Sequence, residues 1–112
     1  MKKILLIILA ISLFGCGGNK PSQEQKDKAD RYVQSLVDAD IGIYKGELTD
    51  ANFLIIAVDA YSGANFDAYA RTYLEEAQGK GLEIKGVYIV DIKNCQFGDG
   101  WVSGDRIGKA FK

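Results

Sequence analysis

Two aspartates stand at or near the ends of two apolar stretches in the second half of the 112-residue chain, and they are its best candidates for chemistry. Asp59 follows the apolar run at residues 53–58, and Asp91 lies near the end of the run at 84–92. Both runs predict strands with a helix between them, so the strands should be parallel and their carboxyl ends should share one edge. Two carboxylates there would share a proton or hold a cation such as Ca²⁺ or Mg²⁺. The simpler interpretation is that each is a solvated turn residue after a strand.

A second group of oxygen-bearing residues lies further along, in Gly98-Asp99-Gly100 and Ser103-Gly104-Asp105. Such residues suit a Ca²⁺ loop, but the alternating ligands and the final Glu of an EF-hand are missing. Asp-Gly is also a strong hairpin signal. We therefore expect a turn here and no metal centre.

The chain has no His and two Cys, Cys16 and Cys95. Without His, it lacks the usual base for a Ser or Cys nucleophile and the commonest transition-metal ligand. We expect Cys95 to be a buried thiol, with an intermolecular disulfide as the alternative. The sequence predicts no cofactor, and it favours binding over catalysis, although hydrolases that use only carboxylates exist.

Two aromatic residues, Tyr61 and Trp101, fall in predicted loops. Exposed aromatic side chains favour partner recognition because they bury a large apolar area while keeping a polar atom for hydrogen bonding. One exposed patch holding both residues would favour a binding protein. A pocket holding both Asp59 and Asp91 would favour an enzyme.

The N-terminal residues have the layout of a secretory signal. Lys2 and Lys3 precede an apolar run at 4–14, and the small residue Gly15 stands before Cys16. The run is too short to span a bilayer, which takes about 20 apolar residues. An ordinary signal peptide that happens to contain Cys is the plain alternative.

The motif Leu13-Phe14-Gly15-Cys16 resembles the lipobox of bacterial lipoproteins. The resemblance implies that Cys16 receives a diacylglycerol and, after cleavage before it, becomes an acylated N-terminus. The protein would then be held on a bacterial membrane by lipid, since two or more acyl chains give stable anchoring. In Gram-negative relatives an Asp after the Cys retains the protein in the inner membrane, so Gly17 favours the outer membrane.

Composition sets the scale of the folded part. Removing residues 1–15 takes two lysines with it and leaves 97 residues with 12 basic and 15 acidic side chains, a net charge of about −3. That length makes one small domain. We assign residues 16–22 to the lipidated Cys and a polar tether, and residues 23–112 to the domain. Because basic side chains are not concentrated on any one element, nucleic acid is not an expected partner.

Helical spacing and β-branched runs divide the domain into elements. Ser22 and Gln25 fit a capping box that opens a helix ending near residues 40–42. The polar face of this helix is mixed in charge, which favours packing on a domain over lying on a membrane. After this helix we expect a short strand at 41–44, a turn at 48–52 and a central strand at 53–58. A second helix should follow at 64–78, capped by Ser62 or Asn65, and then a strand at 84–92. The rest should be a turn with a possible closing strand at 95–102, and a helical turn or irregular tail at 105–111.

These elements predict an α/β or α+β fold, with a small sheet of three to four strands, one βαβ unit and two helices packed on it. The favoured function is that of a membrane-anchored envelope lipoprotein whose domain binds a macromolecular partner, most simply an envelope protein, or a ligand. One alternative is a small carboxylate-dependent hydrolase or cation-binding protein that uses Asp59 and Asp91. Another is an envelope inhibitor or exclusion lipoprotein.

Overall fold

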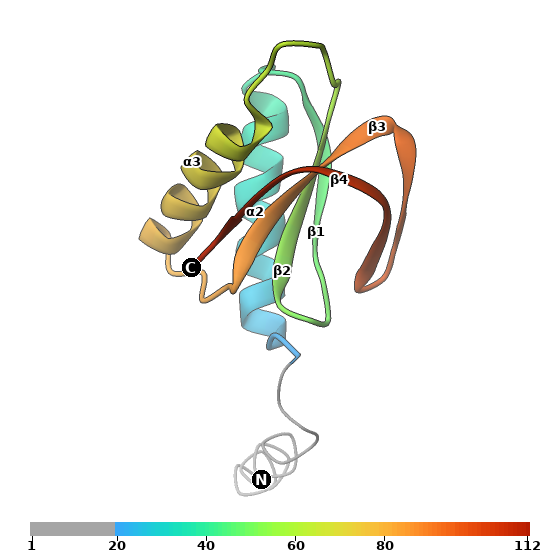
Figure 1. Cartoon of the computed structure of the whole chain (residues 1–112). Coiled ribbons are helices and arrows are strands. Elements are labelled where there is room, and N and C mark those ends of the chain that lie inside the picture. Colours follow the sequence, from blue (N-terminus) through green and yellow to red (C-terminus); the bar gives the residue numbers. More distant parts are fainter. Residues whose placement is uncertain (1–19) are drawn as a thin grey trace, which may run out of the picture.

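The computed structural model describes residues 20–112, which fold into an α+β domain with two helices on one face of a four-stranded sheet (Figure 1). The predicted fold class is therefore correct. The elements in chain order are α2 (Gln23–Asp38), β1 (Ile43–Leu48), β2 (Phe53–Val58), α3 (Phe66–Gly79), β3 (Gly86–Gly98) and β4 (Trp101–Phe111).

The sheet has the strand order β1-β2-β3-β4. The outer pairs, β1 with β2 and β3 with β4, are antiparallel, whereas β2 and β3 are parallel and are joined through α3. This is the predicted βαβ unit. Its register sets Val58 opposite Asp91, so the carboxyl ends of β2 and β3 meet at one edge of the sheet.

Both helices begin at the predicted caps. The hydroxyl of Ser22 accepts from the backbone N–H of Gln25 at 3.1 Å, and the side chain of Asn65 accepts from Ala68 N at 3.1 Å. The other hydrogen bond of the predicted capping box, between the Gln25 side chain and the backbone of Ser22, does not form, however. The Gln25 side chain does not reach back to Ser22 but bonds Gly81 O at 3.0 Å and Glu83 N at 2.7 Å. It thereby fastens the first turn of α2 to the loop between α3 and β3.

The main core lies between the helices and the sheet. Alternate residues of β2 and β3 point into it, and the helices contribute one apolar stripe each, as amphipathic helices do. The buried residues include Leu54, Ile56, Val87 and Ile89 from the sheet, and Tyr32, Leu36, Ala70 and Leu74 from the helices. Helix α2 approaches β1 closely at Gly46, where an added Cβ would stand 2.8 Å from Val33 Cγ2.

The C-terminal third differs most from the prediction. Residues 105–111 are neither a helical turn nor an irregular tail, because they form most of β4 and pair with β3, as Tyr88 with Lys109 and Val87 with Ala110. Asp99 and Gly100 make the predicted turn of the β3–β4 hairpin, but Ser103-Gly104-Asp105 lies inside β4. A register shift between Val90 and Cys95 interrupts the pairing, as a β-bulge does when it bends a strand.

The bent hairpin supplies a second core on the face opposite the helices. Ile55, Ala57, Val90 and Val102 are buried there. The hairpin tip reaches the turn between β1 and β2, where Gly100 O accepts from Asp50 N at 2.9 Å and Gly100 N donates to Glu47 Oε2 at 2.9 Å. Because both faces of the centre of the sheet are covered, the continuous apolar run of β2 is fully explained.

Candidate functional site

A cavity of about 320 Å³ opens at the carboxyl end of β2, at the end of the domain away from the start of α2. We call it the tyrosine pocket. Its lining comes from the loop after α2, the end of β2, the loop that follows it, and the first two turns of α3. The lining residues are Ile41, Gly42, Val58, Asp59, Tyr61, Phe66, Tyr69 and Tyr73.

Three aromatic rings pack against one another at steep angles at the mouth of this pocket. The ring centroids of Tyr61 and Phe66 are 5.8 Å apart, and those of Phe66 and Tyr69 are 5.9 Å apart. The hydroxyls of Tyr61 and Tyr69 share a hydrogen bond of 2.8 Å. Tyr61 is nevertheless 58 % exposed and Tyr69 is 41 % exposed, so the cluster presents a large apolar area to solvent.

The hydroxyls of Tyr61 and Tyr73 stay protonated at neutral pH, because the pKa of each is raised. The hydrogen bond to Tyr69 raises the pKa of Tyr61, with a smaller contribution from desolvation. Burial raises the pKa of Tyr73, and the nearby charge of Glu76 adds to the effect. The pocket therefore offers neutral O–H groups beside apolar rings, which suits recognition of a partly apolar group.

Asp59 and Asp91 do lie at the same sheet edge, as the parallel pairing predicted, but a lysine stands between them. Lys93 Nζ is 2.6 Å from Asp59 Oδ1 and 3.8 Å from Asp91 Oδ1. Asp91 Oδ1 also accepts from the backbone N–H of Lys93 at 3.1 Å. The hydrogen bond to Asp59 raises the pKa of Lys93, so its positive charge offsets the two carboxylates.

Lys93 was not among the site residues predicted from the sequence. The only signal was its position two residues after Asp91, and that spacing alone does not turn a side chain toward a neighbouring strand. Only Asp59 lines the tyrosine pocket, so the pocket does not hold both carboxylates. Within the part of the chain that the structure describes, no group of three or more His, Cys, Asp or Glu is placed to hold a metal ion.

Comparison with known proteins shows the family of the chain. The sequence model of a protein family described as "hypothetical protein" matches residues 24–112. The chain belongs to this family. None of the curated proteins compared with the chain matches it.

The chain is also similar to a protein of known structure. It is a protein from Parabacteroides distasonis ATCC 8503, described as having an alpha-lytic protease prodomain-like fold. The two are 46 % identical, with a TM-score of 0.68, and the match covers 75 % of this chain and 99 % of the other. The chain of that crystal structure is thus almost wholly this domain, so the relative folds as the domain alone.

Trp101, the other aromatic candidate, does not line the tyrosine pocket. Trp101 is 51 % exposed and sits beside the hairpin tip. This tip contacts the turn before β2, whereas Tyr61 follows the other end of β2. The two residues therefore do not form one patch. The relative position of Tyr61 and Trp101 could not be predicted, because the sequence does not show the path of the β3–β4 hairpin.

Cys95 is half-buried, and so is less enclosed than predicted. It packs against the second core, and its Sγ lies 3.9 Å from Ile92 O. The register shift in β3 places it near the edge of that core instead of in its centre. Cys16 and the rest of the lipobox lie outside the described residues.

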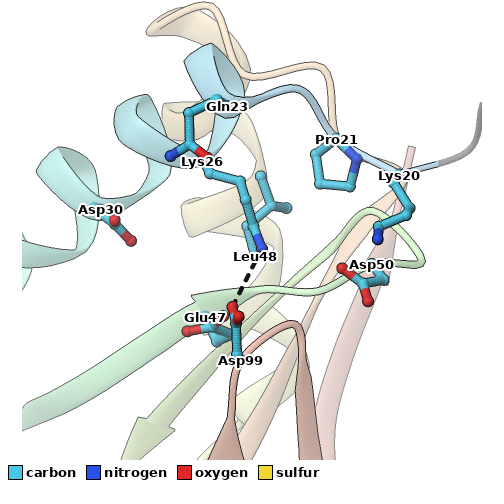
Figure 2. Close-up of a pocket in the computed structure, with 9 residues that line it drawn as sticks. All are labelled: Lys20, Pro21, Gln23, Lys26, Asp30, Glu47, Leu48, Asp50 and Asp99. Atoms are coloured by element: carbon cyan, nitrogen blue, oxygen red, sulfur yellow. Dashed lines mark ion pairs between the residues drawn. The ribbon is translucent and has the colours of Figure 1, made fainter. Parts of the chain in front are cut away.

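Another cavity, of about 490 Å³, lies at the other end, between the start of α2, the β1–β2 turn and the hairpin tip (Figure 2). Its lining is polar and mixed in charge, with Lys20 and Lys26 facing Asp50 and Asp99. Lys26 Nζ and the fully exposed Asp99 carboxylate are 3.9 Å apart, a weak ion pair. We interpret this cavity as a solvated junction between α2 and the hairpin. Among residues 20–112 no helix is long and apolar enough to cross a membrane.

Proposed function

We propose that this protein is a lipid-anchored lipoprotein of the bacterial cell envelope, and that its domain binds a protein partner through the tyrosine pocket. The anchor rests on the lipobox-like motif ending in Cys16. The observation that carries the binding function is the placement of exposed aromatic side chains at the end of the domain opposite the tether.

The geometry of the anchored domain supports this placement. Cys16 precedes Lys20 by four residues, which span at most about 14 Å. The start of α2 must then stay close to the bilayer. The 16 residues of α2 extend about 24 Å from there, and Ile41 and Gly42 of the tyrosine pocket follow its far end. The pocket would face away from the membrane, where a partner can reach it.

The chemistry of the pocket favours a protein over a small molecule. Interface anchors are typically aromatic residues that are exposed in the free protein and buried in the complex. Ile41, Tyr61 and Tyr69 are each more than 40 % exposed, so the free pocket leaves much apolar area to bury. A small-molecule site would usually enclose its ligand more completely.

One observation favours a more specific version of this function, that of an inhibitor of an envelope enzyme. The solved relative has a fold named after a protease prodomain. The rival hydrolase or cation-binding function gains no such support, because Lys93 already offsets the charge of Asp59 and Asp91.

The test is affinity capture by the full lipidated chain from its own membranes. The double variant Tyr61→Ala/Tyr69→Ala should lose the captured partner. The control Trp101→Ala removes an aromatic residue of similar exposure at the other end and should retain it. Equal capture by all three proteins would contradict the proposal.

A further inference from the structure

A second aromatic surface lies on the sheet face opposite the helices, near the tether. Phe53, Tyr88 and Phe111 form a triangle of rings with centroids 5.2, 5.6 and 6.0 Å apart. Phe111 is 44 % exposed. Cavities of about 210 and 410 Å³ flank this cluster, and both are lined by Tyr88 and Arg106.

Basic residues lie beside these rings. The Arg106 guanidinium lies over the Tyr88 ring, 5.2 Å from its centroid, and Lys109 pairs with Tyr88 across the β3–β4 ladder. Lys85 is placed next to the cluster because its carbonyl accepts from Lys112 N, directly after Phe111. We call Phe53, Tyr88 and Phe111, together with Lys85, Arg106 and Lys109, the basic aromatic surface.

None of these three cations forms an ion pair with another residue of the range 20–112. Arg106 bonds only neutral carbonyls, Val102 O at 3.1 Å and Gly104 O at 3.0 Å. Two carboxylates line the flanking cavities. Asp67 lines the smaller one and accepts from the backbone N–H of Lys109 at 2.9 Å, and Asp50 lines the larger one. The surface therefore keeps an excess of positive charge beside exposed rings.

This surface lies at the end of the domain that the tether enters. Phe53 begins β2, and Phe111 pairs with Gly86 at the beginning of β3. The first turn of α2 bonds the loop just before β3 through Gln25. Figure 1 shows the chain ending beside the start of β3. An anchored Cys16 would thus keep the basic aromatic surface near the bilayer.

We propose that the basic aromatic surface binds the anionic lipid surface beside the anchor. Aromatic rings settle at the headgroup level of a bilayer, and Lys and Arg beside them are attracted to anionic headgroups. Docking in this way would fix the orientation of the domain and hold the tyrosine pocket away from the membrane. The inference rests on the proposed lipid anchor, but it involves residues that the tyrosine pocket does not use.

A peptide adding a strand to β4 fits this region less well than a lipid surface. Strand addition needs free backbone groups along an edge. On β4 the N–H of Lys109 already donates to Asp67, and Arg71 donates to Phe111 O at 3.3 Å. Side chains of α3 thus occupy the edge beside the rings.

The experiment measures binding of residues 20–112, without lipid, to vesicles. Vesicles of phosphatidylcholine are compared with vesicles in which about a third of the lipid is phosphatidylglycerol. We expect binding to the anionic vesicles only, weakened by added salt. Lys109→Gln should weaken it about fivefold, whereas the matched control Arg31→Gln, an exposed residue of α2, should leave it unchanged.

Phe111→Ala should also weaken binding to the anionic vesicles. If loss of this ring disturbs folding, Lys109→Gln still tests the proposal. Equal binding to neutral and anionic vesicles, no binding to either, or equal loss in Lys109→Gln and Arg31→Gln would overturn the proposal. Tighter binding to a single-stranded RNA oligonucleotide than to anionic vesicles would also overturn it, in favour of a nucleic-acid surface. Each of these outcomes leaves the capture test of the tyrosine pocket unaffected, so the two proposals fail separately.

Discussion

Lys93 Nζ lies 2.6 Å from Asp59 Oδ1, so a cation built into the chain occupies the sheet edge where the sequence predicted two facing carboxylates. The residues come from β3 and from the position after β2, which the parallel pairing brings together. Lys93 thereby offsets one of the two negative charges of this pair.

The first prediction follows from this ion pair. Asp59→Asn/Asp91→Asn should leave the melting temperature within a few degrees of wild type. The Lys93–Asp59 ion pair is exposed, and such pairs contribute little to stability. An amide oxygen at position 91 can still accept from the backbone N–H of Lys93. Neither Ca²⁺ nor Mg²⁺ should raise the melting temperature of either protein. Thermal melting with and without each cation checks this, and a cation-dependent rise that vanishes in the double variant would restore the cation site.

The second prediction concerns the hydrogen bond that joins the two helices. Tyr32 OH donates to Glu76 Oε1 at 2.7 Å, and burial, reinforced by this bond, raises the pKa of Tyr32 well above its ordinary value. Tyr32→Phe should lower the free energy of unfolding at pH 7 by about 1 kcal/mol, the usual net contribution of a hydrogen bond. Urea unfolding measures the difference.

The pH dependence of the same pair has a definite sign. A raised folded-state pKa means that the contribution of Tyr32 is complete below the unfolded value of about 10. It is lost as the pH rises above that value, because the unfolded chain releases the proton more readily. Wild type should therefore lose stability between about pH 10 and 11 more steeply than Tyr32→Phe. Parallel curves for the two proteins would show that the hydroxyl is not held as described.

The third prediction tests the packing of α3 against β4. At Gly108 an added Cβ would stand 2.5 Å from Phe66 O, a backbone atom that cannot rotate away. Gly108→Ala should therefore destabilise the domain by about 1–3 kcal/mol, as overpacking does. Gly79→Ala is the control, since no atom lies within 4 Å of a Cβ there. Similar losses of unfolding free energy in the two variants would mean that this close approach is wrong.

The fourth prediction concerns the anchor. Cys16→Ser should abolish incorporation of radiolabelled palmitate and leave uncut precursor or a soluble form, because the lipobox-like motif ends at this residue. Cys95→Ser, which removes the other thiol, should incorporate label normally. Equal labelling of wild type and Cys16→Ser would exclude lipidation at Cys16.

The parts of the fold that the sequence predicted were those set by local pattern. The apolar run of β2, the stripe of α3 and the caps at Ser22 and Asn65 each depend on neighbouring residues and were correct. The strand β4 was missed because Gly104 and Gly108 interrupt its alternation. Its position depends on pairing with β3 and on contacts from α3, which no local pattern shows.

The candidate site was predictable to a similar degree. Parallel pairing correctly placed Asp59 and Asp91 at one edge. Tyr61 and Trp101 are both exposed as expected, but Trp101 begins β4 instead of lying in a loop. Lys93 and the separation of Tyr61 from Trp101 could not be predicted, because both depend on the path of the long hairpin. The same path leaves Cys95 half-buried instead of buried.

Photo-crosslinking in intact cells tests the central claim most directly. A photoreactive phenylalanine analogue replaces Tyr61 in the lipidated protein, and in a matched strain it replaces Trp101. The account predicts a discrete crosslinked protein product from position 61, absent at position 101 and lost when Tyr69→Ala is added. A product that forms equally from both positions, or no product from position 61, would contradict a partner-binding site at the tyrosine pocket.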